Sequence, residues 1–318
     1  MQFRSKLRDI VTKVGGLSLL EKLLYLEQDI YSLKRIKTIF PVKRGQFVFY
    51  INPSFQHPGL ADRLKAILGC YYIAKKNNLE FRLVFEHPFK LQNYLEPNLV
   101  KWYSTDERFY SLIGTKIFNY NGHFELLSRQ YNYLCYNYVG IDLLETDGCK
   151  EYGLWRTLYN ELFKRSELLE SAIRATELPA KSYVSIHFRF LNALGHFEKS
   201  NVGVLPPNEQ EELVEKCKVA IMSLYKKYGD QYKIMVFSDS SYFMGLIHDL
   251  PVYTLGDENI THISYSNNQS GVLKTFLDFS MIARSAIVYR ALSPHLYKTN
   301  YSLVAALSDN TEFHDIEI

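Results

Sequence analysis

Short apolar segments alternate with amphipathic segments through the second half of the chain. Segments rich in β-branched and aromatic residues are typical of strands buried in a sheet, and we expect such strands at 182–190, 233–239, 251–255 and 286–292. Apolar residues recur at helical spacing between them, which predicts a short helix after residue 239 and longer ones at 208–228, 271–285 and 301–307. Asn208 is expected to cap the first long helix. This alternation predicts a parallel sheet covered by helices on both faces.

The first half of the chain shows the same alternation after a helical beginning. We expect a strand at 45–52, a helix beginning at Leu60 and a second strand at 81–86, which together form a βαβ unit. Residues 88–150 show no clear period, and helices are expected to resume at 151–176. An α/β architecture is therefore predicted for both halves.

Residues 1–37 combine regularly spaced leucines with basic residues, which predicts a basic amphipathic helix. Such a helix can lie on an anionic membrane surface, or it can pack on its own domain with a solvated basic face. We favour the packed helix, because basic faces are common on the helices of soluble proteins. Peripheral membrane contact through residues 1–37 remains the alternative.

Composition and charge are those of an ordinary globular protein. The chain has 318 residues, of which 47% are apolar and 22% charged, and this composition excludes disorder as its main state. A net charge of +3 is too small for a concentrated basic face, so nucleic acid is not expected as a partner. At roughly 100–200 residues per domain, the length favours two domains. Pro179 breaks the helical pattern, which predicts domains at 1–176 and 177–318.

The cysteines give no sign of a metal site or a disulfide framework. The four of them lie far apart with no C-x-x-C spacing, so we expect reduced thiols at Cys70, Cys135, Cys149 and Cys217. The N-terminus lacks the apolar core of a signal peptide, and no run of about 18 apolar residues occurs. A cytoplasmic location is therefore expected, with membrane association limited to residues 1–37.

The ends of the predicted strands carry candidate binding residues, because ligands of open α/β sheets bind beyond the carboxyl ends of the strands. Arg189 lies at the end of the strand at 182–190, where its planar guanidinium can grip phosphate oxygens. A surface ion pair for Arg189 and a core position for His187 are the alternatives. Asp239 ends the next strand and can accept a hydrogen bond from a ribose or a base, although we favour helix capping for it.

Two further segments can approach a ligand. The helix at 301–307 begins within a run of polar side chains, Thr299, Asn300, Tyr301 and Ser302. Free N–H groups at a helix N-terminus bind anions without a metal, and an ordinary N-cap is the alternative. Gly59 lies in the turn before Leu60, where a ligand can come close to the backbone, but a single glycine is a weak signal. The sequence contains neither GxGxxG nor GxxxxGKS, which argues against dinucleotide oxidoreductases and P-loop NTPases.

Taken in order, these segments resemble the GDP-fucose-dependent fucosyltransferases. The shared features are a G-x-x-D-R-L turn, an H-x-R strand end, a strand ending in F-S-D-S, an L-D-F helix and a polar turn before an A-A helix. They cover roughly residues 45–310, and most of the specificity lies in 182–307. The resemblance implies an α/β, glycosyltransferase B-like fold of two Rossmann-like domains facing a central cleft. It implies an acceptor-side domain at 1–176 and a nucleotide-sugar-binding domain at 177–318.

The resemblance also implies roles for individual residues. Arg189 matches an arginine that binds the β-phosphate, and His187 is its neighbour two positions earlier. Asp278 matches an aspartate that contacts the nucleoside. The other donor-binding matches are the polar pair Asp239 and Ser240, the pyrophosphate turn Thr299, Asn300, Tyr301 and Ser302, and the first-domain turn residues Gly59, Asp62 and Arg63.

The sequence departs from the family pattern beside Arg189. Many members read H-x-R-R-x-D, whereas this chain has Phe190 in place of the second arginine and Asn192 in place of the aspartate. The second basic contact would then be lost or supplied by another residue, such as Lys199 or Lys298.

The function implied is that of an inverting glycosyltransferase in polysaccharide biosynthesis. It would move fucose from GDP-fucose to a hydroxyl of a glycan or glycoconjugate acceptor, with Arg189 stabilising the leaving diphosphate. His57 is the best-placed general base, with His196 and Glu198 as rivals, and an ordinary role in a hydrogen-bonded turn is equally compatible with His57.

No cofactor is expected, because the donor segments contain no carboxylate pair in metal-ligand spacing such as DxD. The alternative function, which the altered H-x-R-F sequence favours, is a catalytically inactive module of the same fold that binds a nucleotide sugar or a glycan.

Overall fold

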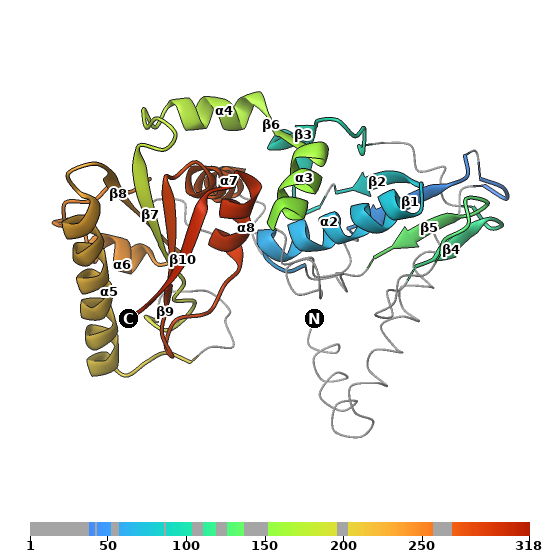
Figure 1. Cartoon of the computed structure of the whole chain (residues 1–318). Helices are drawn as coiled ribbons and strands as arrows, with labels where there is room; N and C mark the ends of the chain where they lie inside the picture. The colour runs from blue at the N-terminus through green and yellow to red at the C-terminus, as the bar shows by residue number, and fades with distance from the viewer. Residues whose placement is uncertain are drawn as a thin grey trace, which may run out of the picture. The chain divides into compact units, whose positions relative to one another are not determined.

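The structure is a computed structural model of the whole chain (Figure 1). The residues that it describes are 38–41, 43–51, 57–85, 87–103, 111–118, 126–136, 152–195, 203–256 and 269–318. The helix expected at 1–37 lies outside them. Packing divides the chain into two compact units, which we describe separately: the first comprises Met1–Tyr50, Cys70–Val84 and Tyr103–Val139, and the second Ile51–Gly69, Phe85–Trp102 and Gly140–Ile318. The domain boundary near residue 177 stays a prediction.

The first unit is built on a four-stranded parallel sheet of order β2-β1-β5-β4. Its strands are β1 (Gln46–Tyr50), β2 (Glu80–Val84), β4 (Thr115–Ile117) and β5 (Asn132–Cys135). The strands expected at 45–52 and 81–86 are confirmed, and α2 (Leu60–Lys76) connects them as expected. Strands β4 and β5 lie in the stretch without a clear period, because segments of three or four residues are too short to show one.

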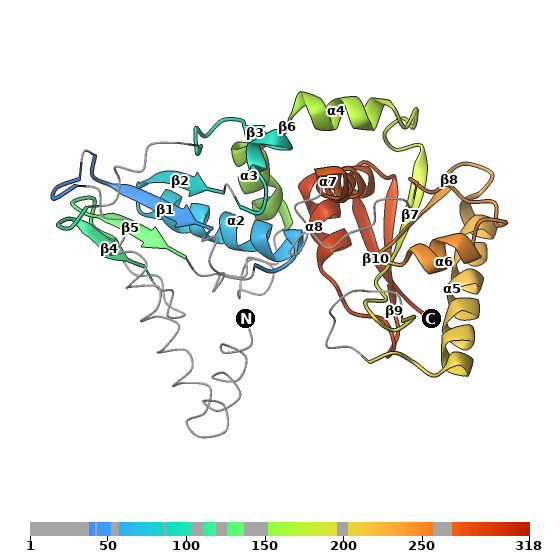
Figure 2. The ribbon, with the colours of Figure 1, turned by 180° about the vertical axis from the view of Figure 1, so that it is seen from behind.

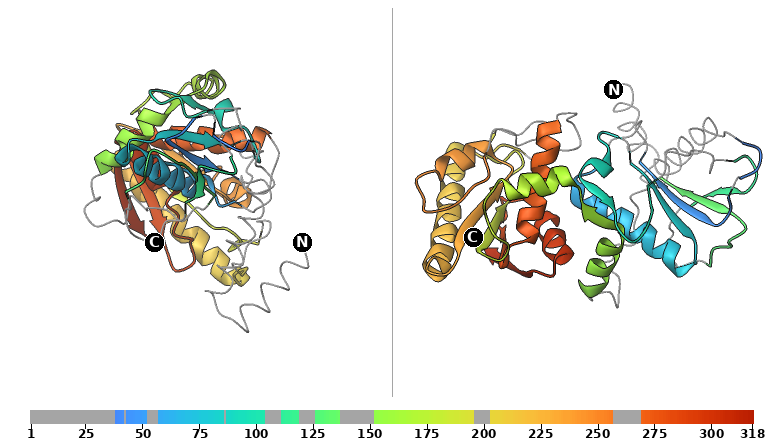
Figure 3. Two further views of the ribbon diagram at one scale, coloured as in Figure 1. Left: turned by 90° about the vertical axis from the view of Figure 1, so that its right-hand side faces the viewer. Right: turned by 90° about the horizontal axis from the view of Figure 1, so that it is seen from above.

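The second unit is built on a second parallel sheet, of order β10-β9-β7-β8. Its strands are β7 (Tyr183–Phe188), β8 (Lys233–Ser238), β9 (Ile287–Leu292) and β10 (Glu312–Glu317). Helices α5 (Pro207–Tyr228) and α6 (Ser241–Leu246) cover one face, and α7 (Gln269–Ala283) and α8 (Tyr301–Ser308) cover the other (Figures 1 and 2). Figure 3 shows the same layers from above. The predicted parallel sheet with helices on both faces is confirmed here.

The residues of β7 show why the helices on the two faces of this sheet make different kinds of contact with it. Val184, Ile186 and Phe188 alternate along the strand and belong to the apolar core that also contains buried residues of α5 and α6. The alternate residues Tyr183, Ser185 and His187 face the other layer, where the Tyr183 hydroxyl donates a hydrogen bond of 2.6 Å to the Met281 carbonyl of α7. The face toward α7 and α8 is therefore the polar one.

The rest of the second unit packs beside α7 and α8. It contains η1 (Leu91–Asn93), β3 (Leu95–Pro97), α3 (Tyr152–Leu162), β6 (Phe163–Arg165) and α4 (Glu167–Arg174). The helices expected at 151–176 are confirmed as α3 and α4, with β6, which pairs antiparallel with β3, between them. Ser166 then caps α4 by accepting a hydrogen bond from the Leu169 amide. The Trp155 indole N–H donates to the Ser308 hydroxyl at 3.3 Å, which fixes α3 against α8.

Two expectations about the second half were wrong, and one strand was not predicted. Residues 251–255 do not form a strand, and only Tyr253 makes an isolated bridge, to Met235. Asn208 does not cap α5, because the helix begins one residue earlier, with Pro206 as its N-cap and proline in the first turn. The chain also continues past α8 into β10, which the apolar pattern did not predict because charged residues dominate this edge strand.

None of the helices in the described part of the chain is long and apolar enough to cross a bilayer. The described cysteines Cys70, Cys135 and Cys217 are in no disulfide, and Cys149 lies outside the described residues.

Candidate functional site

The candidate site lies where the second sheet changes direction. The chain passes from β7 to β8 on one side and then returns to place β9 on the other side of β7. Such a switch point leaves a crevice outside the carboxyl ends of the two central strands. Arg189 follows β7 directly, and residues 299–302 follow β9 and begin α8. The topology therefore brings together the two segments that were predicted to bind phosphate.

A row of three polar residues crosses the sheet below this edge. His187 of β7 pairs in register with Arg290 of β9, which pairs in register with Asp315 of β10. Residues in register on neighbouring strands share a face, so all three lie on the side of α7 and α8. Sequence analysis missed Arg290 and Asp315, because one lies inside an apolar strand and the other in the strand that was not predicted.

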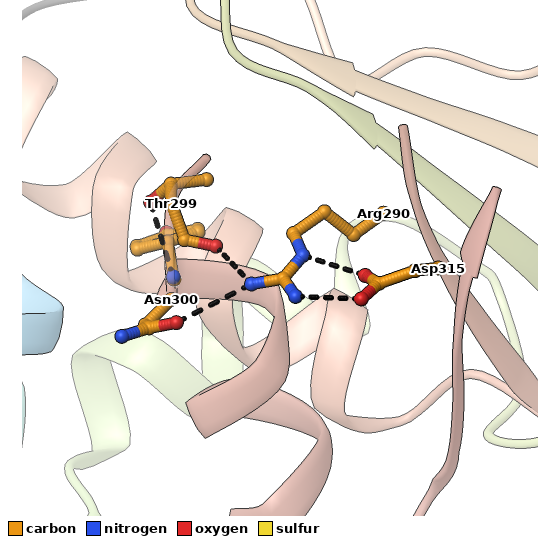
Figure 4. Close-up of polar contacts among 5 residues, drawn as sticks. Arg290, Thr299, Asn300 and Asp315 are labelled. Atoms are coloured by element: carbon orange, nitrogen blue, oxygen red, sulfur yellow. Dashed lines mark hydrogen bonds and ion pairs between the residues drawn. The ribbon is translucent and has the colours of Figure 1, made fainter. Parts of the chain in front are cut away.

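Arg290 ties the turn before α8 to the sheet (Figure 4). Its guanidinium is buried and donates to both carboxylate oxygens of Asp315, Nε to Oδ1 at 2.7 Å and Nη2 to Oδ2 at 2.9 Å. Its Nη1 donates to the Thr299 carbonyl at 2.7 Å and to the Asn300 side-chain oxygen at 3.3 Å. One side chain thus fixes both residues that lead into α8.

The N-terminus of α8 keeps donors available. Asn300 stands at the N-cap position, but its side chain bonds to Arg290 and makes no cap hydrogen bond. Thr299 Oγ1 accepts from the Tyr301 amide at 3.1 Å. Helix geometry leaves the amides of Ser302 and Leu303 without an intrahelical acceptor, and the first intrahelical bond runs from Val304. The predicted alternative of an ordinary side-chain N-cap is therefore wrong for Asn300.

The hydroxyl of Ser302 is the clearest sign of a ligand at this helix end. Ser302 is fully buried, and its Oγ has no hydrogen-bond partner among the residues that the structure describes. Buried hydroxyls in native proteins are almost always paired. A bound anion, held by the Ser302 hydroxyl and by the free amides of the first turn, would supply the missing acceptor.

His187 lies buried beside this helix end. Its ring centroid is 5.5 Å from that of Tyr301, and its Nδ1 has no hydrogen-bond partner within the described ranges. Burial, together with the positive charges of Arg189 and Arg290, lowers the pKa of His187 to about 3. The imidazole is therefore neutral at physiological pH, and the core position named as the alternative is where this residue lies.

The lowered pKa of His187 predicts a loss of stability in mild acid. The unfolded chain binds a proton below about pH 6.5 and the folded chain only near pH 3, so stability falls as the pH falls through this window. We compare the free energy of unfolding at pH 7.5 and at pH 5, measured in urea titrations. The decrease between these pH values should be about 2 kcal/mol smaller in His187→Phe than in wild type. Exposed His248 supplies the matched control, His248→Gln, which should behave like wild type. Identical losses in wild type and His187→Phe would contradict the neutral, buried imidazole.

Arg189 and Asp239 form an ion pair at the edge of the sheet, with Arg189 Nη1 at 3.3 Å from Asp239 Oδ2. The Asp239 carboxylate also accepts hydrogen bonds of 2.8 Å from the backbone amides of Phe190 and Leu191. Burial raises the pKa of Asp239, and the Arg189 charge and the two amides oppose the rise. Asp239 therefore clamps the turn after β7. The capping role favoured for it was wrong, because Ser240 caps α6 by accepting from the Phe243 amide at 3.1 Å.

Phe190 belongs to the apolar core. Its ring is fully buried and lies 4.8 Å from the ring of Phe243. The position that carries a second arginine in many fucosyltransferases thus points away from the ligand edge. Of the two lysines considered as replacements, Lys298 lies in the loop before α8, and Lys199 lies outside the described residues.

Asp278 lies on α7, the helix that packs against α8. Its two carboxylate oxygens accept hydrogen bonds from Lys274 at 2.6 and 2.8 Å, and both side chains are largely buried. Burial raises the pKa of Asp278, and the Lys274 ammonium opposes the rise. The neighbouring Tyr301 hydroxyl donates to the Thr275 carbonyl of the same helix. Asp278 is thus already paired, and a nucleoside would share it with Lys274.

The turn before α2 contains one tightly packed side chain, that of Arg63, and one position with open space beside it, Gly59. The Arg63 side chain is fully buried, donates from Nε to the Pro58 carbonyl at 2.8 Å and lies over the rings of Phe85 and Phe89. Gly59 has open space where a side chain would begin. Asp62 is half exposed and pairs with Lys65 at 3.1 Å. Arg63 therefore holds the turn, and Gly59 leaves room for a ligand.

His57, the candidate base, is buried in this turn, with its ring centroid 6.4 Å from that of His87. Its rivals His196 and Glu198 lie outside the described residues. The described ranges contain no group of three or more residues that could hold a metal ion.

Comparison with known proteins identifies solved structures with a similar fold. No family model matches the sequence, and no curated protein is similar to it in sequence. Among solved structures, NodZ alpha-1,6-fucosyltransferase soaked with GDP-fucose is 14% identical with a TM-score of 0.57, over 83% of this chain and 92% of that one. Fucosyltransferase NodZ from Bradyrhizobium is 13% identical with a TM-score of 0.56, over the same shares. A mutant of Arabidopsis thaliana FUT1 in complex with GDP is 10% identical with a TM-score of 0.54, over 91% of this chain and 74% of that one.

The chain has the glycosyltransferase B-like fold. The fold class expected from the sequence is thereby confirmed, and so is the structural likeness to the fucosyltransferases. At 10–14% identity the likeness concerns the fold alone. What the chain binds must therefore be argued from its own residues.

Proposed function

We propose that the protein is an inverting glycosyltransferase that moves fucose from GDP-fucose to a hydroxyl of a glycan or glycoconjugate acceptor, without a metal ion. The observation that carries the proposal is the meeting of Arg189 and the donor-rich N-terminus of α8 at the switch point of the second sheet. The similar NodZ structure was soaked with GDP-fucose, and the similar FUT1 structure is a complex with GDP. Their similar fold, together with the polar groups at the carboxyl end of the second sheet, supports a GDP-sugar as the donor of this protein.

The geometry suits a diphosphate leaving group. The Arg189 guanidinium can bind two phosphate oxygens at once, and the free amides and hydroxyl at the start of α8 can accept the remaining charge. Donors held in place before the reaction stabilise charge that develops in the transition state. In this proposal Asp278 contacts the nucleoside from α7, and His57 removes the proton from the acceptor hydroxyl.

A panel of nucleotide sugars tests the donor class. We expect GDP and GDP-fucose to raise the melting temperature, and UDP-, ADP- and CMP-linked sugars to leave it unchanged. A ligand at about 100 times its Kd adds roughly 2.7 kcal/mol of stability, which a thermal-shift assay resolves. EDTA should not alter the shift, because the donor segments offer amides, a hydroxyl and a guanidinium rather than a carboxylate cluster. A strict need for Mn²⁺ or Mg²⁺, or stabilisation by UDP-sugars alone, would contradict the proposal.

One observation favours a second candidate, a binding module without catalysis. Phe190 replaces the second arginine of many fucosyltransferases and points into the core, so the site has one cation fewer at that strand end. A module would bind GDP-fucose and release no GDP from it. The cytoplasmic location and the membrane contact through residues 1–37 stay predictions.

A further inference from the structure

We propose that the Arg290–Asp315 pair is a positioning device for the turn that receives the β-phosphate, which makes the C-terminal strand β10 part of the donor site. The inference rests on the proposed function. Neither residue would touch the donor: both act through Thr299 and Asn300, which lead into the first turn of α8 (Figure 4).

The hydrogen bonds of Arg290 connect Asp315 to the turn before α8. A guanidinium has five N–H donors in a rigid plane. Two go to the Asp315 carboxylate and two to the turn, through the Thr299 carbonyl and the Asn300 side chain. Asp315 fixes the orientation of the guanidinium plane, and the guanidinium in this orientation holds Thr299 and Asn300. Asp315 balances the charge of Arg290, as Asp239 pairs with Arg189 at the end of β7.

A cross-strand ion pair that only joins β9 to β10 is the competing interpretation. Backbone ladders already join these strands over all six residue pairs, so the sheet does not need the side-chain pair for its register. The bond to Asn300 also takes that side chain away from the capping role, which leaves the amides of the first helical turn to a ligand. The unpartnered Ser302 hydroxyl lies in the same turn. These contacts favour a role in the site.

The test compares GDP with GMP, which lacks the β-phosphate, by isothermal titration. Wild type should bind GDP more tightly than GMP. In Asp315→Asn and in Arg290→Lys we expect GDP affinity to fall about tenfold and GMP affinity to change little, a coupling of ordinary size between sites. The ratio of the two Kd values should thus move toward one. Exposed Glu317 on the same strand supplies the control, and Glu317→Gln should keep the wild-type ratio.

The outcomes separate this inference from the proposed function. An unchanged ratio in both variants, with GDP affinity reduced in Arg189→Lys, would overturn the positioning role and leave the donor site standing. Equal weakening of GDP and GMP would show a merely structural pair and would also overturn it. If wild type bound neither GDP nor GMP, the result would contradict the proposed function itself, and with it the inference that rests on it. Should Asp315→Asn fail to fold, Arg290→Lys, which keeps the charge, decides the matter alone.

Discussion

Arg189→Lys is expected to lower the rate of fucose transfer by about a hundredfold to a thousandfold, the usual loss when one preorganised donor to a developing negative charge is removed. Lysine keeps the charge but is a point donor, so it cannot grip two phosphate oxygens in one plane. The ion pair with Asp239 can persist in the variant, and the two backbone hydrogen bonds of Asp239 do not involve the side chain at position 189. The fold should therefore survive.

Turnover and melting temperature measured on one preparation separate the possible roles of Arg189. The matched control is Arg174→Lys, because Arg174 is an exposed arginine of α4 that pairs with Glu167 and belongs neither to the end of β7 nor to the turn before α8. If Arg189 were only an ion-pair partner, both lysine variants would keep full turnover. Near-wild-type turnover in Arg189→Lys would remove the main reason for placing the donor at the end of β7.

Asp239→Ala is expected to lower the free energy of unfolding by about 3–5 kcal/mol, the usual loss when one partner of a buried ion pair is deleted. The Asp239 side chain is 4% exposed, so solvent does not replace it. Its removal leaves the amides of Phe190 and Leu191 without their acceptor and deletes the ion pair with Arg189. A loss of this size is a large fraction of the stability of an ordinary domain.

Urea unfolding with Asp249→Ala as the control measures this effect. Asp249 is fully exposed and pairs with the exposed His248, so its replacement should leave the unfolding midpoint unchanged. Asp239→Asn keeps one carbonyl oxygen as an acceptor and should fall between wild type and the alanine variant. Equal midpoints in wild type and Asp239→Ala would mean that the turn after β7 is held by other contacts.

The ends of the long apolar strands could be predicted from the sequence, because burial on both faces leaves a continuous hydrophobic signal. This is how Arg189, Asp239 and the turn at 299–302 were found. The contacts that organise them could not be predicted in the same way. Arg290 stands inside an apolar strand, and its partner Asp315 lies 25 residues later in a charged edge strand, so only the strand pairing brings them together.

A local rule also assigned the wrong role to one residue found in this way. Asp239 precedes a short helix, as a capping residue does, but its carboxylate turns back to the loop after β7, which follows a neighbouring strand in the sheet. A contact between distant segments thus replaces the role that the neighbours of Asp239 in sequence indicate.

Release of GDP from GDP-fucose, in EDTA, by wild type and by Arg189→Lys tests most directly whether this edge of the second sheet performs glycosyl transfer. We expect slow release by wild type in water alone, faster release with a glycan acceptor, and a steep loss in the lysine variant. Wild-type protein that binds GDP-fucose and releases no GDP with any acceptor, or a lysine variant as active as wild type, would contradict the account.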